Sequence, residues 1–64
     1  MEDNVHVVGI DKGTGYIVAC TNCGRSDAEA FAKYYRKIGY NARIVTEEVL
    51  DYMLEQERQE RKLY

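Results

Sequence analysis

The chain opens with two short runs in which nearly every residue is apolar, at residues 5–10 (VHVVGI) and 16–21 (YIVACT). Runs of this length that are rich in valine and isoleucine are typical of β-strands. The segment 11–15 between them contains two glycines, which supply the positive φ angles that hairpin loops require. The pattern therefore predicts a β-hairpin. Because the first run is apolar on both faces, we expect its strand to be central in the sheet and covered on both sides.

Residues 27–38 carry apolar side chains three and four positions apart, the spacing of one face of an α-helix. This stripe consists of Ala28, Phe31, Ala32, Tyr35 and Ile38. Ser26 precedes it as a candidate N-cap, and Glu29 stands three residues later in the position of a capping box. Gly39 follows the stripe, where a residue in the left-handed conformation would end the helix. Residues 41–46 then alternate as a third strand does.

Residues 47–62 predict a second helix whose character changes along its length. Thr46 is its candidate N-cap, and the two glutamates that follow are favoured by the positive end of the helix dipole. The first two turns carry the apolar residues Val49, Leu50, Met53 and Leu54, whereas residues 55–62 (EQERQERK) are all polar. We therefore expect the first half of the helix to pack on the sheet and the second half to project into solvent.

Together these elements predict one α+β domain of order ββαβα over residues 1–64. About 20 residues link the second and third strands, which is enough for a helical crossover. Crossovers between parallel strands of one sheet are right-handed in about 98% of cases. The simplest sheet is three-stranded and mainly antiparallel, with the first strand in the middle, the other two on its sides and the first helix on one face.

The size and composition of the chain limit the functions it can have. A chain of 64 residues leaves little room for an internal active-site cleft. Its acidic N-terminus lacks the basic region of a secretory signal, and no apolar run approaches the roughly 18 residues that a membrane span needs. We therefore expect a cytoplasmic protein with reduced thiols and no membrane partner. With one histidine and no catalytic grouping in the sequence, a non-enzymatic role is favoured.

Cys20 and Cys23 form a Cys-x-x-Cys-Gly step that resembles one knuckle of a zinc ribbon. Two thiolates do not complete a tetrahedral site, so this alternative requires zinc shared between protomers, and no cofactor is expected in a single chain. The order strand, Cys-x-x-Cys, helix, strand also resembles the opening of a glutaredoxin, where the helix N-terminus lowers the pKa of the first thiol. That family places a cis-proline opposite the cysteine pair, and this chain has no proline. A metal-binding or thiol-redox module remains one alternative function.

Residues 9–15 (GIDKGTG) resemble the first phosphate loop of the sugar-kinase, actin and heat-shock ATPases. In that family the aspartate helps to hold Mg²⁺ and the glycines approach the phosphates. The chain is several-fold too short to build the two-lobed nucleotide cleft of the family. A hairpin needs glycine in its loop for backbone reasons alone, and this is the simpler interpretation.

Charge is divided unevenly along the chain. Residues 25–45 contain five cations and two acids, whereas the segments on either side are acidic and the whole chain has a net charge of −2. The basic residues of interest are Lys33, Arg36, Lys37 and Arg43, with Tyr34 among them. Cations interleaved with tyrosine are typical of surfaces that bind nucleic acid. The acidic balance of the chain argues against this role, which stays as a second alternative.

The leading hypothesis is a small non-enzymatic binding or regulatory protein that acts through protein–protein contact. It would act as a homodimer, or as an inhibitor or modulator of a larger partner. The chain has six tyrosines and an apolar sheet, more than so short a chain is expected to cover, and tyrosine is enriched at interfaces. The predicted contact residues are Leu50, Met53, Leu54 and Tyr64 of the second helix and its end, with Tyr34 and Tyr52 beside them.

Overall fold

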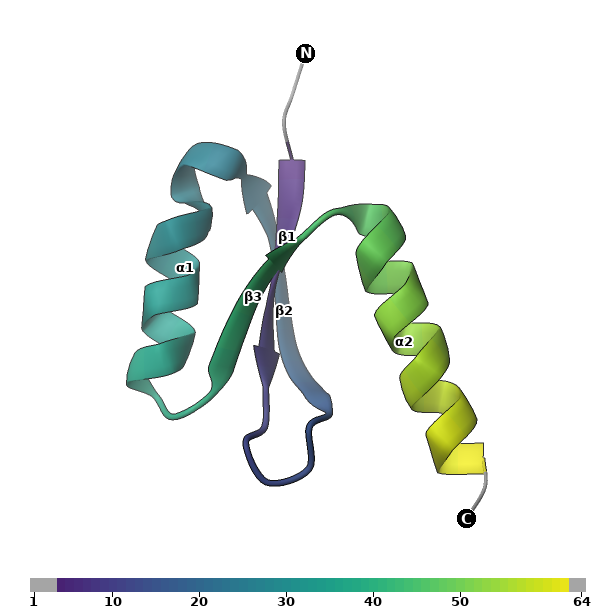
Figure 1. The fold of residues 1–64 in the computed structure, drawn as a ribbon. Helices are drawn as coiled ribbons and strands as arrows, with labels where there is room; N and C mark the ends of the chain where they lie inside the picture. Colours follow the sequence, from purple (N-terminus) through teal and green to yellow (C-terminus); the bar gives the residue numbers. More distant parts are fainter. Residues whose placement is uncertain (1–3, 63–64) are drawn as a thin grey trace.

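The computed structural model describes residues 4–62, and Figure 1 shows how their elements are arranged. In chain order these are β1 (Asn4–Ile10), β2 (Ile17–Gly24), α1 (Arg25–Lys37), β3 (Asn41–Val45) and α2 (Glu47–Lys62). The sheet has the strand order β2-β1-β3, and both neighbouring pairs are antiparallel. The predicted α+β fold with a central first strand is confirmed. Within the described residues, neither helix is long and apolar enough to cross a membrane.

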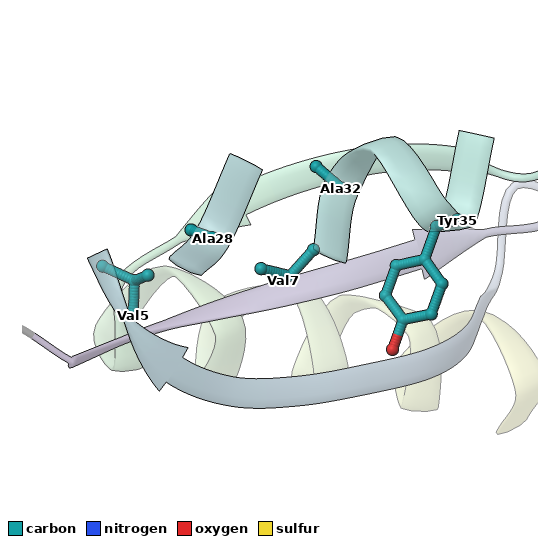
Figure 2. Close-up of a cluster of buried hydrophobic side chains, with 5 residues drawn as sticks. All are labelled: Val5, Val7, Ala28, Ala32 and Tyr35. Carbon is teal, nitrogen blue, oxygen red and sulfur yellow. The ribbon is translucent and has the colours of Figure 1, made fainter. Parts of the chain in front are cut away.

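One face of the sheet is covered by α1. The buried residues on this side are Val5, Val7, Ala28, Ala32 and Tyr35, shown in Figure 2. The two alanines have small side chains, which allow the helix to lie close to β1. Tyr35 also contacts β2, because its hydroxyl lies 2.6 Å from Oγ1 of Thr21. Gly9 makes room for this packing, since a Cβ atom there would stand 3.4 Å from Cγ of Tyr35 and 3.2 Å from Cδ2 of Tyr40.

The opposite face of the sheet is covered by three successive turns of α2. Leu50 is only 8% exposed and lies in a second buried cluster with Val8 of β1 and the end of β3. Met53 packs against the same cluster, next to Ile17. One turn further, Oε2 of Glu57 accepts a hydrogen bond from the backbone amide of Ile17 at 3.0 Å. The docked part of α2 therefore extends one turn beyond its apolar residues, through a carboxylate.

The predicted start of α1 is wrong, and so is the predicted end of β2. Pairing with β1 continues as far as Asn4 opposite Gly24, so β2 runs three residues beyond the predicted end at residue 21. Cys23, which lies beyond the predicted strand, is therefore part of β2. The helix follows at once, with Gly24 as its N-cap and no side-chain cap hydrogen bond. Ser26 lies inside α1, so it does not cap the helix and the predicted capping box with Glu29 is absent.

The other predicted helix ends are confirmed. Gly39 has a φ of +106°, the left-handed conformation expected just beyond α1. Thr46 caps α2, because its Oγ1 accepts a hydrogen bond from the amide of Val49 at 3.4 Å. The predicted bounds of 47–62 for α2 agree with the structure, and those of β1, α1 and β3 agree to within two residues.

Two residues of the predicted apolar stripe of α1 are more exposed than expected. Ala28, Ala32 and Tyr35 occupy the centre of the buried face, whereas Phe31 is 37% exposed and Ile38 is also exposed. On a regular helix, Phe31 and Ile38 lie roughly 60–80° to one side of the centre of the buried face. The stripe is therefore wider than the contact that α1 makes with the sheet, and its flank faces outwards.

Replacing Leu50 with alanine is expected to lower the free energy of unfolding by about 2–3 kcal/mol, because a buried leucine is truncated in the cluster that joins α2 to the sheet. Urea denaturation followed by circular dichroism would measure the change. Leu54→Ala is the matched control: it removes the same atoms from a side chain that is 41% exposed, and should cost less than about 1 kcal/mol. Equal losses would contradict the placement of Leu50 in the core.

Replacing Glu57 with alanine is expected to lower stability by about 1–2 kcal/mol, because the partly buried amide of Ile17 loses its acceptor. Hydrogen exchange at the Ile17 amide should become faster in this variant. Glu55→Ala is the control, since Glu55 contacts only the exposed side chains of Arg58 and Gln59 on its own helix. An unchanged exchange rate at Ile17 in Glu57→Ala would show that the bond does not hold α2 in place.

Candidate functional site

Leu50 and Met53, which were predicted to contact a partner, are used within the chain itself. Leu50 is buried against the second face of the sheet, and Met53 is half-buried beside it. Leu50 is therefore not accessible to a partner in this structure. The physical reason is that Val8 points to this face and needs cover, so the apolar residues of α2 that looked surplus in the sequence are required by the sheet.

The remaining predicted contact residues lie on two separate sides of the molecule. Tyr34 is 57% exposed on α1, whereas Tyr52 is 65% exposed on α2 and Leu54 is exposed on the same helix. Because the two helices cover opposite faces, the sheet stands between Tyr34 and the other two (Figure 1). Tyr64 lies outside the described residues. The five predicted residues that the structure describes do not form one surface.

A shallow apolar hollow lies between α1 and β2, and its volume is about 380 Å³. Its lining residues are Thr21, Ala30, Phe31, Tyr34 and Tyr35. None of them is charged, and the two hydroxyls of Thr21 and Tyr35 are hydrogen-bonded to each other. The sequence interpretation missed this hollow because it assigned Phe31 to the core. The spacing of Phe31, Tyr34 and Ile38 along one flank of α1 is the signal that could have revealed it.

The hollow adjoins the outer edge of β2. In the described part of the chain, β2 pairs with β1 on one side and with no strand on the other. Its sequence, IVACTNCG, contains neither the charged residues nor the proline that usually protect an edge strand. Val18 is 50% exposed along it, and Cys20 is exposed as well. The hollow and this edge together form a neutral surface, here called the β2 surface, made up of Val18, Cys20, Thr21, Ala30, Phe31 and Tyr34.

The two cysteines lie on opposite faces of the sheet. Cys20 pairs with Val8 and Cys23 with Val5, and these two valines point to different faces. Three residues along an extended strand separate the two Cα atoms by roughly 10 Å, beyond the roughly 7 Å that a disulfide can bridge. Partial burial also raises the pKa of the Cys20 thiol, the reverse of what an attacking thiolate needs. This geometry does not bring the pair together for metal or redox chemistry within one chain.

The four basic residues proposed for nucleic-acid binding are also divided. Lys33 and Lys37 flank a second shallow hollow of about 320 Å³ on α1, together with Ala30 and Tyr34, and Arg36 is exposed on the same helix. Arg43 pairs with Val8, so it lies on the face of the sheet that α2 covers. Arg43 therefore does not extend the basic side of α1.

The hairpin loop uses its aspartate to hold its own backbone. Oδ1 of Asp11 accepts hydrogen bonds from the amides of Gly13 at 2.7 Å and Thr14 at 3.0 Å. Gly15 has a φ of +77°, a conformation in which glycine is favoured. The aspartate and the glycine of the segment that resembles a phosphate loop therefore both have a local structural role in the turn.

Iodoacetamide is expected to alkylate Cys20 only slowly at neutral pH, because its raised pKa lowers the fraction of thiolate. The pH midpoint of the reaction, followed by mass spectrometry, should be higher for the folded chain than for the chain unfolded in urea. Mild oxidation should leave the monomer without an internal disulfide. A folded-state midpoint below the unfolded one, or loss of two hydrogens from the monomer, would contradict this placement of the thiols.

In comparisons with protein-family models, with the sequences of characterised proteins and with solved structures, this chain has no significant match.

Proposed function

We propose that the protein is a small non-enzymatic binding protein that acts through protein–protein contact. The observation that carries the proposal is the β2 surface, which stays open after both helices have packed. Phe31, Tyr34 and Val18 are 37–57% exposed there. Adjacent apolar side chains on the surface of so small a domain are typical of a site where another protein docks.

The chemistry of the β2 surface favours recognition over catalysis. The residues that line its hollow are uncharged, and the hydroxyls of Thr21 and Tyr35 are paired with each other at 2.6 Å. Tyr34 offers a large ring with few rotatable bonds, so ordering it on binding costs little conformational entropy. Such a surface supplies contact area and shape, and the raised pKa of the Cys20 thiol on it does not favour an attacking thiolate.

The outer side of α2 is a less suitable contact surface. Glu48, Asp51 and Glu55 are exposed around Tyr52 there, and carboxylates are depleted from the cores of protein interfaces. We place the contact on the β2 surface for this reason. The proposal covers both self-association and modulation of a larger partner, in the cytoplasm, where free thiols stay reduced.

Introducing a charge at Tyr34 is expected to abolish association. Native mass spectrometry over a range of protein concentrations would detect a second protomer, and affinity capture with the tethered protein would detect another partner. Tyr34→Asp should lose whatever the wild type binds, because the carboxylate would have to be desolvated. Tyr52→Asp is the control, since it makes the same change on α2 and should bind as the wild type does. A wild type that is monomeric at every concentration and captures no protein would refute the proposed function.

A further inference from the structure

We propose that the occupant of the β2 surface is a second copy of this chain, paired β2 to β2 in antiparallel fashion. This inference rests on the proposed function and names its partner. The two three-stranded sheets would join into one sheet of six strands, with a twofold axis near the middle of β2.

The first observation is the open hydrogen-bonding edge. In residues 4–62 no strand pairs with the outer side of β2, which leaves a row of amide and carbonyl groups facing solvent. The amide of Ile17 is already bound by Glu57, so the available segment is 18–24. Two antiparallel copies of one strand offer each other the same groups around a twofold axis, and each satisfies its partner reciprocally.

The second observation is the distribution of charge. A twofold interface sets a surface against its own copy, so any charged patch meets like charge. The β3 edge carries Arg43, the outer side of α1 carries Lys33 and Lys37, and the outer side of α2 carries Glu48 and Asp51. The β2 surface contains no charged residue. Of these four surfaces in the described part of the chain, it is the one whose own residues carry no charge, and Lys33 and Lys37 border it beyond Ala30 and Tyr34.

The third observation is that exposed apolar groups flank this edge on both faces of the sheet. Phe31 and Tyr34 stand beside it on the α1 side. Cys20 pairs with Val8 and so lies on the α2 side, with the exposed Val18 close by in the strand. A partner strand would lie about 5 Å from β2, within reach of both sets. Strand pairing would therefore bury apolar area on both faces in addition to forming hydrogen bonds.

The geometry of α1 fits the same arrangement. Both copies of α1 would lie on one face of the joined sheet and run antiparallel, with the two hollows facing each other across the axis. Phe31 is the middle residue of α1, so the two Phe31 side chains would come close to the axis together. An extended segment of another protein could pair with the edge, but it would leave the hollow on the α1 side open. A second copy supplies the strand and the aromatic side chains at once.

Sedimentation equilibrium of the full chain would measure the dimer dissociation constant in matched variants. Val18→Lys and Tyr34→Lys each place a cation in the β2 surface and should weaken the dimer tenfold or more, because the charge would have to be desolvated when the second copy covers it. Both positions are at least half exposed, so folding should be retained, and thermal unfolding would check this. Tyr52→Lys is the control on α2 and should leave the constant unchanged.

Hydrogen exchange at two protein concentrations supplies a second readout that does not depend on mutation. Within residues 18–24, the amides that point away from β1 should gain protection as the dimer forms, whereas those on the outer side of β3, the other edge strand, should not. Together, protection of 18–24 and a Val18-sensitive dimer support the inference.

Three results would overturn the inference. A dimer that tolerates Val18→Lys and leaves residues 18–24 unprotected would place self-association elsewhere, and so would a dimer weakened by Tyr52→Lys. A monomer that captures a different protein through Tyr34 would replace the second copy with another partner. The first two would also contradict the placement of the contact on the β2 surface while leaving a protein-binding role, and the third leaves the proposed function intact. A monomer that captures nothing refutes both proposals.

Discussion

The structure depends on burying the central strand β1 on both faces. Val7 and Val8 are neighbours in sequence and point to opposite sides, and both are fully shielded from solvent. A strand of this kind needs two covers, and the chain has two helices to supply them. Each helix is therefore committed to its own face: α1 through two alanines and Tyr35, and α2 through Leu50. Once this demand is met, no described helix is left for any other part of the sheet.

That constraint also explains where the molecule stays open. A helix with its side chains is about 10–12 Å wide, whereas three strands spaced about 4.8 Å apart need a wider cover. One helix on each face therefore leaves part of the sheet uncovered. α1 lies mainly over β1 and β3, so β2 is the strand left at the margin on the α1 side, whereas α2 reaches β2 only near Ile17. The exposure of Val18 and the hollow over Thr21 both lie along this margin.

Much of this architecture can be predicted from the sequence, because the decisive signals are local. The apolar periods give the order of the elements, and Gly39 and Thr46 act at helix ends through their own backbone or side chain. The features that were missed depend on tertiary placement. Leu50 is a core residue only because Val8 needs cover, and Glu57 lies in a wholly polar segment that gives no hint of the Ile17 amide. Likewise, Cys23 joins a strand because it pairs with Val5 of β1, and the exposure of Phe31 depends on how α1 is rotated over the sheet.

Two copies of this molecule can meet in two ways that differ in the charge of the surfaces involved. The outer side of α1 is basic and that of α2 is acidic, so stacking α1 on the α2 of another copy is electrostatically attractive. Such a contact is head-to-tail and leaves one helix free at each end, which generates open chains, and it weakens as salt screens the charges. Pairing through the neutral β2 edge uses short-range hydrogen bonds and apolar contact and closes at two copies. The β2 edge is left open by the helices, and the residues along it carry no charge. Its geometry and its charge pattern therefore favour the same closed contact between two copies.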